Sequence, residues 1–250
     1  MSSVLCGKPT PSGPCRRRVS VAGGLCGSAH PNSTPPTVTA SAAPVVAGPD
    51  PLAVVLPTWL QDPVFVGNPG VRARVAEATG NQVALAALAG DVAGEVRSQV
   101  AANSATPPGA LVSLADDPES WVRRSCATNL SCPPEVLGAL ARDPSTDVAE
   151  AAVSNPMTPH AVLAWAAAGD RPVSVRRRAA ANPATPAETL EELAALGDVS
   201  IRQAVAQNPS TPGPVLVAFA ADPDRFIRAA AAANPNLPPA GRAAVGLLDD

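Results

Sequence analysis

One phrase recurs along most of the sequence: an apolar residue, an arginine, then Asn-Pro, Thr-Pro and a leucine at fixed distances. Seven apolar residues open the phrase, and they are spaced 25 to 27 residues apart. Composition bias alone does not produce such regular spacing. The chain therefore carries seven repeats, the first of them degenerate, which begin at Val71, Val96, Val122, Val148, Val175, Ile201 and Ile227.

Other positions keep the same period when the opening residue is counted as offset 0. Arginine stands at offset +1 in six of the seven repeats, with Ala149 as the exception. The last six repeats have Asn at +7 and Pro at +11, and five of these six have Leu at +15. We expect the Asn side chains to satisfy backbone groups where the chain leaves a helix.

The offsets predict two short helices in each repeat. Offsets 0 and +4 share one face of a helix, which Asn-Pro ends because the residue before a proline avoids the helical region. Thr-Pro then starts a second helix, with Thr as N-cap; Thr185 to Glu188 also has the pattern of a capping box. Helices this short are marginal alone, so the repeats must stack into a solenoid with a continuous core and a curved surface.

The recurring pattern VRxxVAxNPxTPxxxLxxLAxD resembles the leucine-rich repeat variant family, as in VRRRAAANPATPAETLEELAALGD at residues 175–198. The resemblance covers roughly residues 68–245. It implies an all-α fold, a right-handed solenoid of alternating α and 3₁₀ helices without the strands of ordinary leucine-rich repeats. It does not imply a catalytic activity. We therefore expect about seven such repeats of 26 residues, preceded by a small metal-binding module.

Three regions are expected along the chain. Residues 1–30 hold three of the five cysteines, and residues 31–57 are rich in Pro, Ala and Thr with a single charge, Asp50. The second region is typical of a semi-extended linker. Residues 58–250 form the predicted solenoid.

The first region has a candidate metal site at Cys6, Cys15, Cys26 and His30. Three thiolates and one imidazole suit a structural zinc ion, and the pattern resembles small modules of the form C…GxxC…CxxxH. The alternatives are a tail without metal and an iron-sulfur cluster. The cluster is considered because some leucine-rich repeat variant proteins have cysteine-rich iron-sulfur modules at the N-terminus, although a standard cluster requires four thiolates.

The arginines at +1 have two interpretations. Lined up by stacking, they could bind phosphates or acidic partners; alternatively, each pairs with an Asp that lies five or six residues earlier, as at Asp91, Asp117 and Asp170. We favour pairing, because residues 60–250 hold 14 Arg against 20 Asp and Glu, a net charge of −6. Residues 1–59 carry +3, but no aromatic residues surround these charges, so nucleic-acid binding is disfavoured.

Catalysis finds little support in the sequence. The chain has two histidines, and we find no Ser/His/Asp order, phosphate-binding glycine loop or paired carboxylates. Specificity is expected instead at the variable offsets +2, +3, +6 and +12 to +14. Arg177 and Arg178 lie at +2 and +3 and do not recur in most repeats, so they are candidate partner-binding residues.

The expected function is that of a non-enzymatic scaffold, which binds a protein or peptide on the curved solenoid face behind a zinc module. The alternative is a zinc-dependent or iron-sulfur regulator that contacts nucleic acid or a redox partner through the N-terminal module. No apolar run approaches the length of a membrane span, and the N-terminus lacks the apolar stretch of a secretory signal. A cytoplasmic location is therefore expected, and the 17 Arg against one Lys favour a bacterial source.

Overall fold

The computed structural model describes residues 3–5, 9–10, 13–14, 18–20 and 58–246. The chain divides into two compact units, Met1–Ala53 and Val54–Asp250. In the first unit β1 (Ser3–Leu5) pairs antiparallel with β4 (Arg18–Ser20), and β2 (Pro9–Thr10) with β3 (Gly13–Pro14). The expected linker at 31–57 lies outside the described residues.

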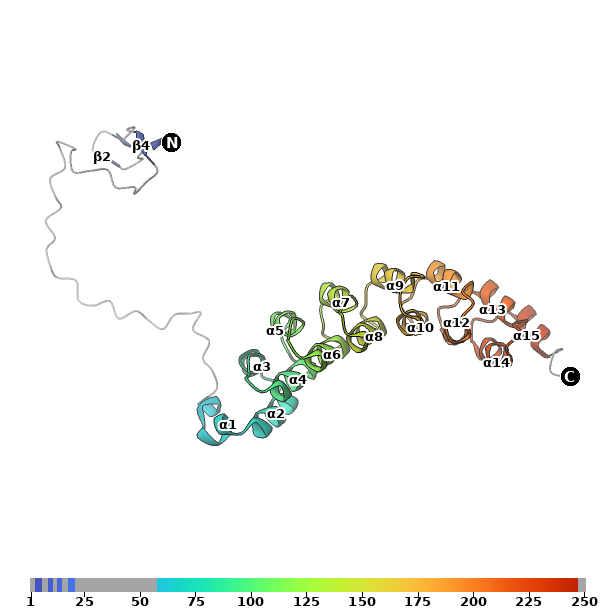
Figure 1. Cartoon of the computed structure of the whole chain (residues 1–250), viewed down its shortest axis with the longest axis horizontal. Coiled ribbons are helices and arrows are strands. Elements are labelled where there is room, and N and C mark those ends of the chain that lie inside the picture. The colour runs from blue at the N-terminus through green and yellow to red at the C-terminus, as the bar shows by residue number, and fades with distance from the viewer. Residues whose placement is uncertain (1–2, 6–8, 11–12, 15–17, 21–57, 247–250) are drawn as a thin grey trace. The chain divides into compact units, whose positions relative to one another are not determined.

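The second unit is an α-solenoid, as the repeat pattern predicts (Figure 1). Its first elements are η1 (Thr58–Gln61) and α1 (Pro63–Gly67), followed by seven pairs of helices. Among the described residues, no helix is long and apolar enough to cross a bilayer. The helix pairs are α2 (Pro69–Ala78) with α3 (Gln82–Leu88), α4 (Gly94–Ala102) with α5 (Pro108–Leu114), α6 (Ser120–Thr128) with α7 (Pro134–Leu140), α8 (Thr146–Ser154) with α9 (His160–Ala167), α10 (Val173–Ala181) with α11 (Ala187–Ala194), α12 (Val199–Gln207) with α13 (Gly213–Phe219), and α14 (Arg225–Ala233) with α15 (Pro239–Gly246).

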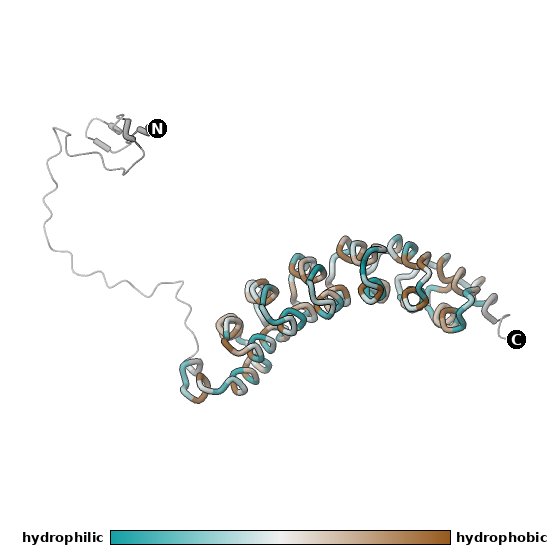
Figure 2. Tube along the Cα trace, in the orientation of Figure 1, coloured by the Kyte–Doolittle hydropathy of each residue, from teal (hydrophilic) through white to brown (hydrophobic). Residues whose placement is uncertain are grey.

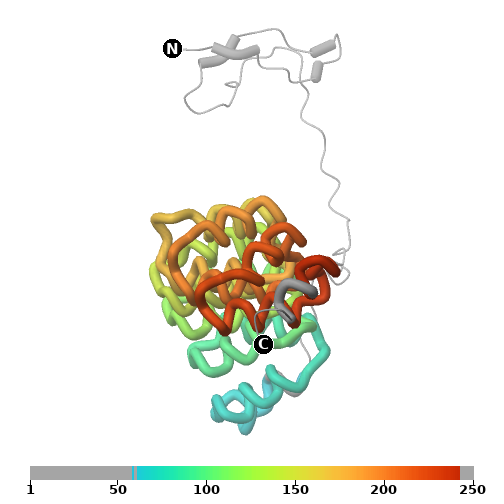
Figure 3. The backbone as a smooth tube through the Cα atoms, turned by 90° about the vertical axis from the view of Figure 1, so that its right-hand side faces the viewer, coloured from blue at the N-terminus to red at the C-terminus, as the bar shows by residue number. Residues whose placement is uncertain are grey.

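Both rows of helices contribute to one continuous core. The first helices of successive repeats pack on one another, α2 on α4, α4 on α6 and onward to α14. Figure 3, turned by 90°, shows the repeats stacked behind one another, and Figure 2 shows that hydrophobic and hydrophilic residues alternate along the helices. The leucines at offset +15 are fully buried, and they are Leu111, Leu137, Leu163, Leu190 and Leu216.

The second helices differ from one expectation of the family resemblance. They are α-helices of seven or eight residues, and in the described part of the solenoid the one 3₁₀ helix, η1, precedes the repeats. The helix-forming bonds connect each amide to the carbonyl four residues earlier, as from Ala115 N to Leu111 O at 3.0 Å. Seven residues are enough to close several such bonds, so the tighter 3₁₀ winding is not needed.

The predicted N-cap role of the Thr residues is wrong. The N-cap of α11 is Pro186, whose backbone is still extended, so Thr185 lies one residue before the helix. The Thr185 hydroxyl donates instead to the carbonyl of Ala179 in α10, at 2.5 Å, and no capping box forms with Glu188. The same bond recurs in three other repeats, so these threonines hold the two helices of one repeat together; they are Thr106, Thr158 and Thr211.

The Asn residues at offset +7 form a buried ladder between repeats, which confirms their predicted structural role. Asn182 donates to the carbonyls of Val153 and Asn155 in the preceding repeat, at 2.7 and 2.9 Å, and its Oδ1 accepts from the amide of Ala184. The last carbonyls of a helix have no partner within it, and the ladder supplies one. Equivalent side-chain bonds to the preceding repeat are made by Asn103, Asn129, Asn155, Asn208 and Asn234.

The arginines at +1 pair with aspartates, but not with those expected. Arg97 holds Asp117, in the turn that leads into α6, in a bidentate pair at 2.6 and 3.0 Å. It donates to the backbone carbonyl, not the carboxylate, of Asp91, in the turn that leads into its own helix α4. The Asp117 carboxylate also accepts from the amide of Glu119, which positions it for the arginine of the preceding first helix. Four bidentate pairs therefore connect the first helix of one repeat to the turn before the next first helix, and they are Arg72–Asp91, Arg97–Asp117, Arg123–Asp143 and Arg202–Asp222.

The middle of the solenoid departs from this pairing. Ala149 replaces the arginine of the fourth repeat, and the expected partner Asp170 is exposed and bonded to its neighbour Arg171. Arg171 and Arg142 instead stack on the Trp165 ring, each 4.4 Å from its centroid. Cation–π stacking thus connects repeats where the ion pair is missing.

The bridging pairs predict a loss of stability in acid. Burial disfavours the charge of Asp91, Asp117 and Asp143, but the arginine and backbone hydrogen bonds outweigh it and hold the pKa of each below its ordinary value. A lowered pKa stabilises the fold above the unfolded value of about 4, and this contribution disappears as pH falls through the folded value. We expect the melting temperature to fall below about pH 4.

Asp117→Asn tests this cause. At neutral pH the substitution should lower the free energy of unfolding by about 2 kcal/mol, because Arg97 loses its charged partner. The difference in melting temperature between the variant and the unmodified protein should narrow in acid. Thermal melts by circular dichroism from pH 7 to pH 2 measure both effects. Asp116→Asn, at an exposed neighbour, is the control. Parallel acid curves for Asp117→Asn and the unmodified protein would contradict the assignment.

Candidate protein-binding surface

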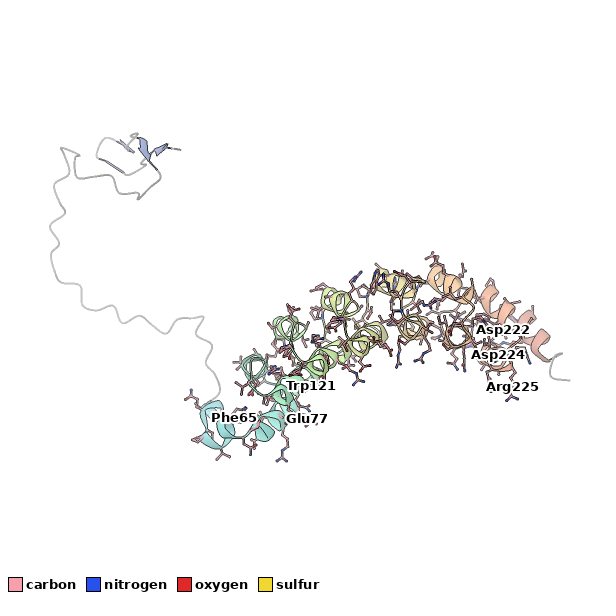
Figure 4. All side chains as sticks on the ribbon, viewed as in Figure 1. Phe65, Glu77, Trp121, Asp222, Asp224 and Arg225 are labelled. Atoms are coloured by element: carbon pink, nitrogen blue, oxygen red, sulfur yellow. The ribbon has the colours of Figure 1, made fainter. Side chains whose placement is uncertain are left out.

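The first helices of the repeats line the concave side of the solenoid, and the second helices line its convex side (Figure 1). On each first helix the offsets −1, +2, +3 and +6 share one face, since they are spaced as i, i+3, i+4 and i+7. We call the residues at these offsets on α2 to α14 the concave stripe. Figure 4 shows side chains projecting along this side from Glu77 near one end to Arg225 near the other.

A hollow of about 490 Å³ lies on this side at α6 and α8. It is lined by charged and hydroxyl side chains, including Arg124, Thr128, Asp147, Glu150 and Ser154. All five belong to the concave stripe. The hollow therefore offers both signs of charge over a short distance.

A second hollow, of about 380 Å³, lies between α10 and α12. Its charged lining residues are Arg177 and Arg178, and the polar ones are Ser200, Gln203 and Gln207. No carboxylate lines it. This hollow thus has a positive charge balance beside uncharged hydrogen-bonding groups.

Arg178 connects the two hollows, because it lines both. Its Nε donates to Glu150 of the neighbouring repeat at 3.1 Å, and 44% of its side chain remains exposed. Burial disfavours the Glu150 charge, but hydrogen bonds from Ser174 and Arg178, and the charge of Arg177, hold the pKa of Glu150 below its ordinary value. The carboxylate is therefore ionised and held toward α10.

The structure thus brings together the two arginines that the sequence singles out. Arg177 is half-buried and Arg178 exposed, next to each other on the concave stripe. Of the offsets expected to vary between repeats, residues at +2, +3 and +6 line the two hollows. Residues at +12 to +14 lie on the second helices and line neither hollow.

Sequence reasoning missed Trp121, which stands at offset −1 on α6. Its side chain is 43% exposed, donates to Glu119 at 3.2 Å and packs over Gly94 of the preceding repeat. A Cβ atom on Gly94 would lie 2.7 Å from the Trp121 ring, so a larger residue there would push the ring outward. The signal was available, because offset −1 shares a helix face with +2, +3 and +6.

The candidate metal ligands Cys6, Cys15, Cys26 and His30 lie outside the described residues. Within the described part of the chain, no group of three or more His, Cys, Asp or Glu side chains is arranged to hold a metal ion. The solenoid's own Cys126 and Cys132 lie together in its core.

The leucine-rich repeat variant family matches residues 94–119 and 200–224. These segments span α4 with α5 and α12 with α13, one helix pair in each case. The leucine-rich repeat variant resemblance is therefore supported directly in two of the seven repeats.

A similar solved structure is described as a leucine-rich repeat variant with a novel repetitive protein structural motif. It is 25% identical, covers 76% of this chain and 78% of its own, and has a TM-score of 0.52. A designed armadillo repeat protein in complex with a (KR)4 peptide is 16% identical, covers 75% of this chain and 97% of its own, and has a TM-score of 0.38. No curated protein matches the sequence.

Proposed function

We propose that the protein is a non-enzymatic scaffold of the leucine-rich repeat variant family, and that its concave stripe binds an extended segment of a partner protein. The observation that carries this proposal is the pair of adjacent hollows on α6 to α12, joined by Arg178. Their lining comes mainly from offsets that differ between repeats, while the offsets that recur are used for stacking. The stripe is therefore where a sequence-specific partner can be recognised.

The charges of the stripe indicate what such a segment carries. Asp147 and Glu150 lie on α8, with Arg124 before them on α6 and Arg177 and Arg178 after them on α10. A basic side chain fits above the acidic pair, and acidic side chains fit beside the arginines. Complementary charges of this kind favour specificity and fast association.

The Arg178–Glu150 ion pair can be broken at low cost when a partner protein binds. An ion pair this exposed contributes about 0 to 1 kcal/mol, so a carboxylate of the partner can replace Glu150 with little loss. Trp121, on the same stripe, adds an aromatic surface of the kind that often dominates interface energies.

A charge reversal on the stripe tests the proposal. Arg178→Glu should weaken capture of the partner at least tenfold, because it places like charges beside Glu150 and removes the site for a carboxylate. The matched control is Arg242→Glu, which makes the same charge change at an exposed position on α15. The measurement is quantitative mass spectrometry of proteins captured by each full-length variant from cells that express the chain.

The expected result is a protein that the unmodified chain and Arg242→Glu retain and Arg178→Glu loses. Equal retention of every captured protein by both variants would contradict binding at the stripe. Circular dichroism of each variant must show the unmodified helix content, since Arg178 is outside the core.

We also propose that Cys6, Cys15, Cys26 and His30 bind zinc in a module that acts as a structural domain. The support is the ligand set itself, which matches the preference of structural zinc. Metal analysis of the full-length protein should give about one zinc per chain, and Cys15→Ser should lower it. A brown protein with iron and a broad absorption band would favour the regulator that acts through an iron-sulfur cluster, and no metal would exclude both.

A cytoplasmic location is proposed with the scaffold, since the candidate zinc ligands suit a reducing compartment. Nucleic acid is a poorer partner for the solenoid, whose residues 60–250 carry a net charge of −6. Phosphate backbones require a positive surface.

A further inference from the structure

The core of the third repeat contains two cysteines in direct contact. Cys126 and Cys132 have their Sγ atoms 3.9 Å apart, and their exposed fractions are 0% and 3%. The Cys126 Sγ also lies 3.3 Å from the carbonyl oxygen of Leu111. Neither cysteine belongs to the concave stripe.

These cysteines replace a recurring bond of the other repeats. Cys126 stands at offset +4 and Cys132 at +10, where Thr106, Thr158, Thr185 and Thr211 stand in other repeats. In those repeats the Thr hydroxyl donates to the carbonyl of the residue at +4, at 2.5 Å. A thiol is a much weaker donor than a hydroxyl. While the two cysteines are reduced, the third repeat therefore lacks this hydrogen bond between the turn and its first helix.

The surroundings favour a covalent bond between the two sulfurs. A disulfide needs a separation of about 2.05 Å, so the sulfurs must approach by roughly 2 Å. Cys132 lies in the turn between α6 and α7, where one backbone bond, from its amide to the carbonyl of Asn129 at 3.1 Å, holds it. The approach of the sulfurs therefore falls mainly to rotation of the two side chains. The contact between the two sulfurs lowers the pKa of Cys132, while the same contact and burial raise the pKa of Cys126. Cys132 is therefore the sulfur that ionises first.

We propose that Cys126 and Cys132 are a redox modification site, which closes to an intrachain disulfide when a peroxide oxidises the protein. The Cys132 thiolate attacks one peroxide oxygen and becomes a sulfenic acid, while the other oxygen leaves as hydroxide and takes up a proton. The Cys126 sulfur then attacks the sulfenic sulfur, its thiol proton is lost and water leaves. Two thiols and one hydrogen peroxide thus give one disulfide and two waters. A thiol reductant reverses the change.

The closed form joins the end of α6 to the turn before α7. It replaces the Thr hydroxyl bond of the other repeats with a covalent one. The two sulfurs meet only because the repeat fold places offsets +4 and +10 in contact, so the disulfide should form in the folded protein.

The sequence provides a clean assay. Trypsin cleaves after Arg124 and Arg142, and the resulting peptide, 125–142, contains Cys126 and Cys132 and no other cysteine. The full-length protein is treated with hydrogen peroxide, denatured, alkylated and digested without reductant. Mass spectrometry should find this peptide unalkylated and lighter by two hydrogen atoms, and dithiothreitol before alkylation should restore two alkyl groups. Far-UV circular dichroism should show unchanged helix content after oxidation.

A matched control restores the pattern of the neighbouring repeats. Cys126→Val with Cys132→Thr should keep the helix content and give a peptide that peroxide leaves unchanged. The proposal is overturned if the native peptide still takes two alkyl groups at peroxide doses that oxidise the N-terminal cysteines. The proposal is also overturned if the sulfurs of Cys126 and Cys132 appear only as sulfinic acids or joined to other peptides. The same holds if the disulfide forms only with loss of helix content.

Discussion

Asn182→Ala is expected to lower the free energy of unfolding by about 4 kcal/mol. The substitution removes both side-chain bonds to the carbonyls of Val153 and Asn155 and the acceptor for the amide of Ala184. Asn182 is 2% exposed, so water cannot readily replace these bonds, and each buried group left without a partner costs about 1 to 3 kcal/mol. Denaturant unfolding followed by circular dichroism measures the change.

Asn182→Asp sharpens this test, since it keeps the acceptor and removes both donors. It should be at least as destabilising, because a carboxylate would face two carbonyl oxygens. The exposed Gln207→Ala serves as control and should change the stability by less than about 0.5 kcal/mol. If Asn182→Ala behaved like Gln207→Ala, the ladder would not be what connects the repeats.

Leu163→Ala is expected to cost about 2 to 5 kcal/mol, the range for a leucine truncated in a close-packed core. Leu163 is 0% exposed at offset +15 of α9, and the cavity it leaves lies in the middle of the solenoid. Denaturant unfolding again gives the value.

Leu130→Ala is the control, because it removes the same atoms from a residue that is 64% exposed. It shows how much of the cost comes from truncating a leucine outside the core. Its effect should stay within about 0.5 kcal/mol. Similar costs at Leu130 and Leu163 would contradict the repeat register, because that register alone places one leucine inside and the other outside.

The sequence predicts most of the solenoid because the same local pattern sets the helix ends and the core positions in every repeat. The helices, the leucine core and the role of the Asn row all follow from spacing and local backbone chemistry. Which aspartate pairs with which arginine does not follow in this way. The arginine of one repeat lies near two aspartates, one before and one after it, and their order in the sequence does not show which carboxylate turns toward it.

The same limit applies to Thr185 and to the cysteine pair. Thr-Pro is a common helix start, but an extended proline at the N-cap leaves the threonine one residue outside, where its hydroxyl meets the preceding helix. Contact between offsets +4 and +10 depends on that turn, so Cys126 and Cys132 look unrelated in the sequence. On the binding surface, the sequence singles out Arg177 and Arg178 because they do not recur, whereas Trp121 is recognised only when offset −1 joins the concave stripe.

Photo-crosslinking tests most directly the claim that the concave stripe binds a partner protein. A photoreactive amino acid is placed in the full-length chain at Gln207, which lines the second hollow, or at Glu191, which is exposed on the convex helix α11. A third position, Arg17, reports on the N-terminal module. We predict a discrete crosslinked partner from Gln207 and none from the other two positions. Crosslinks from Glu191 or Arg17 alone would contradict binding at the concave stripe.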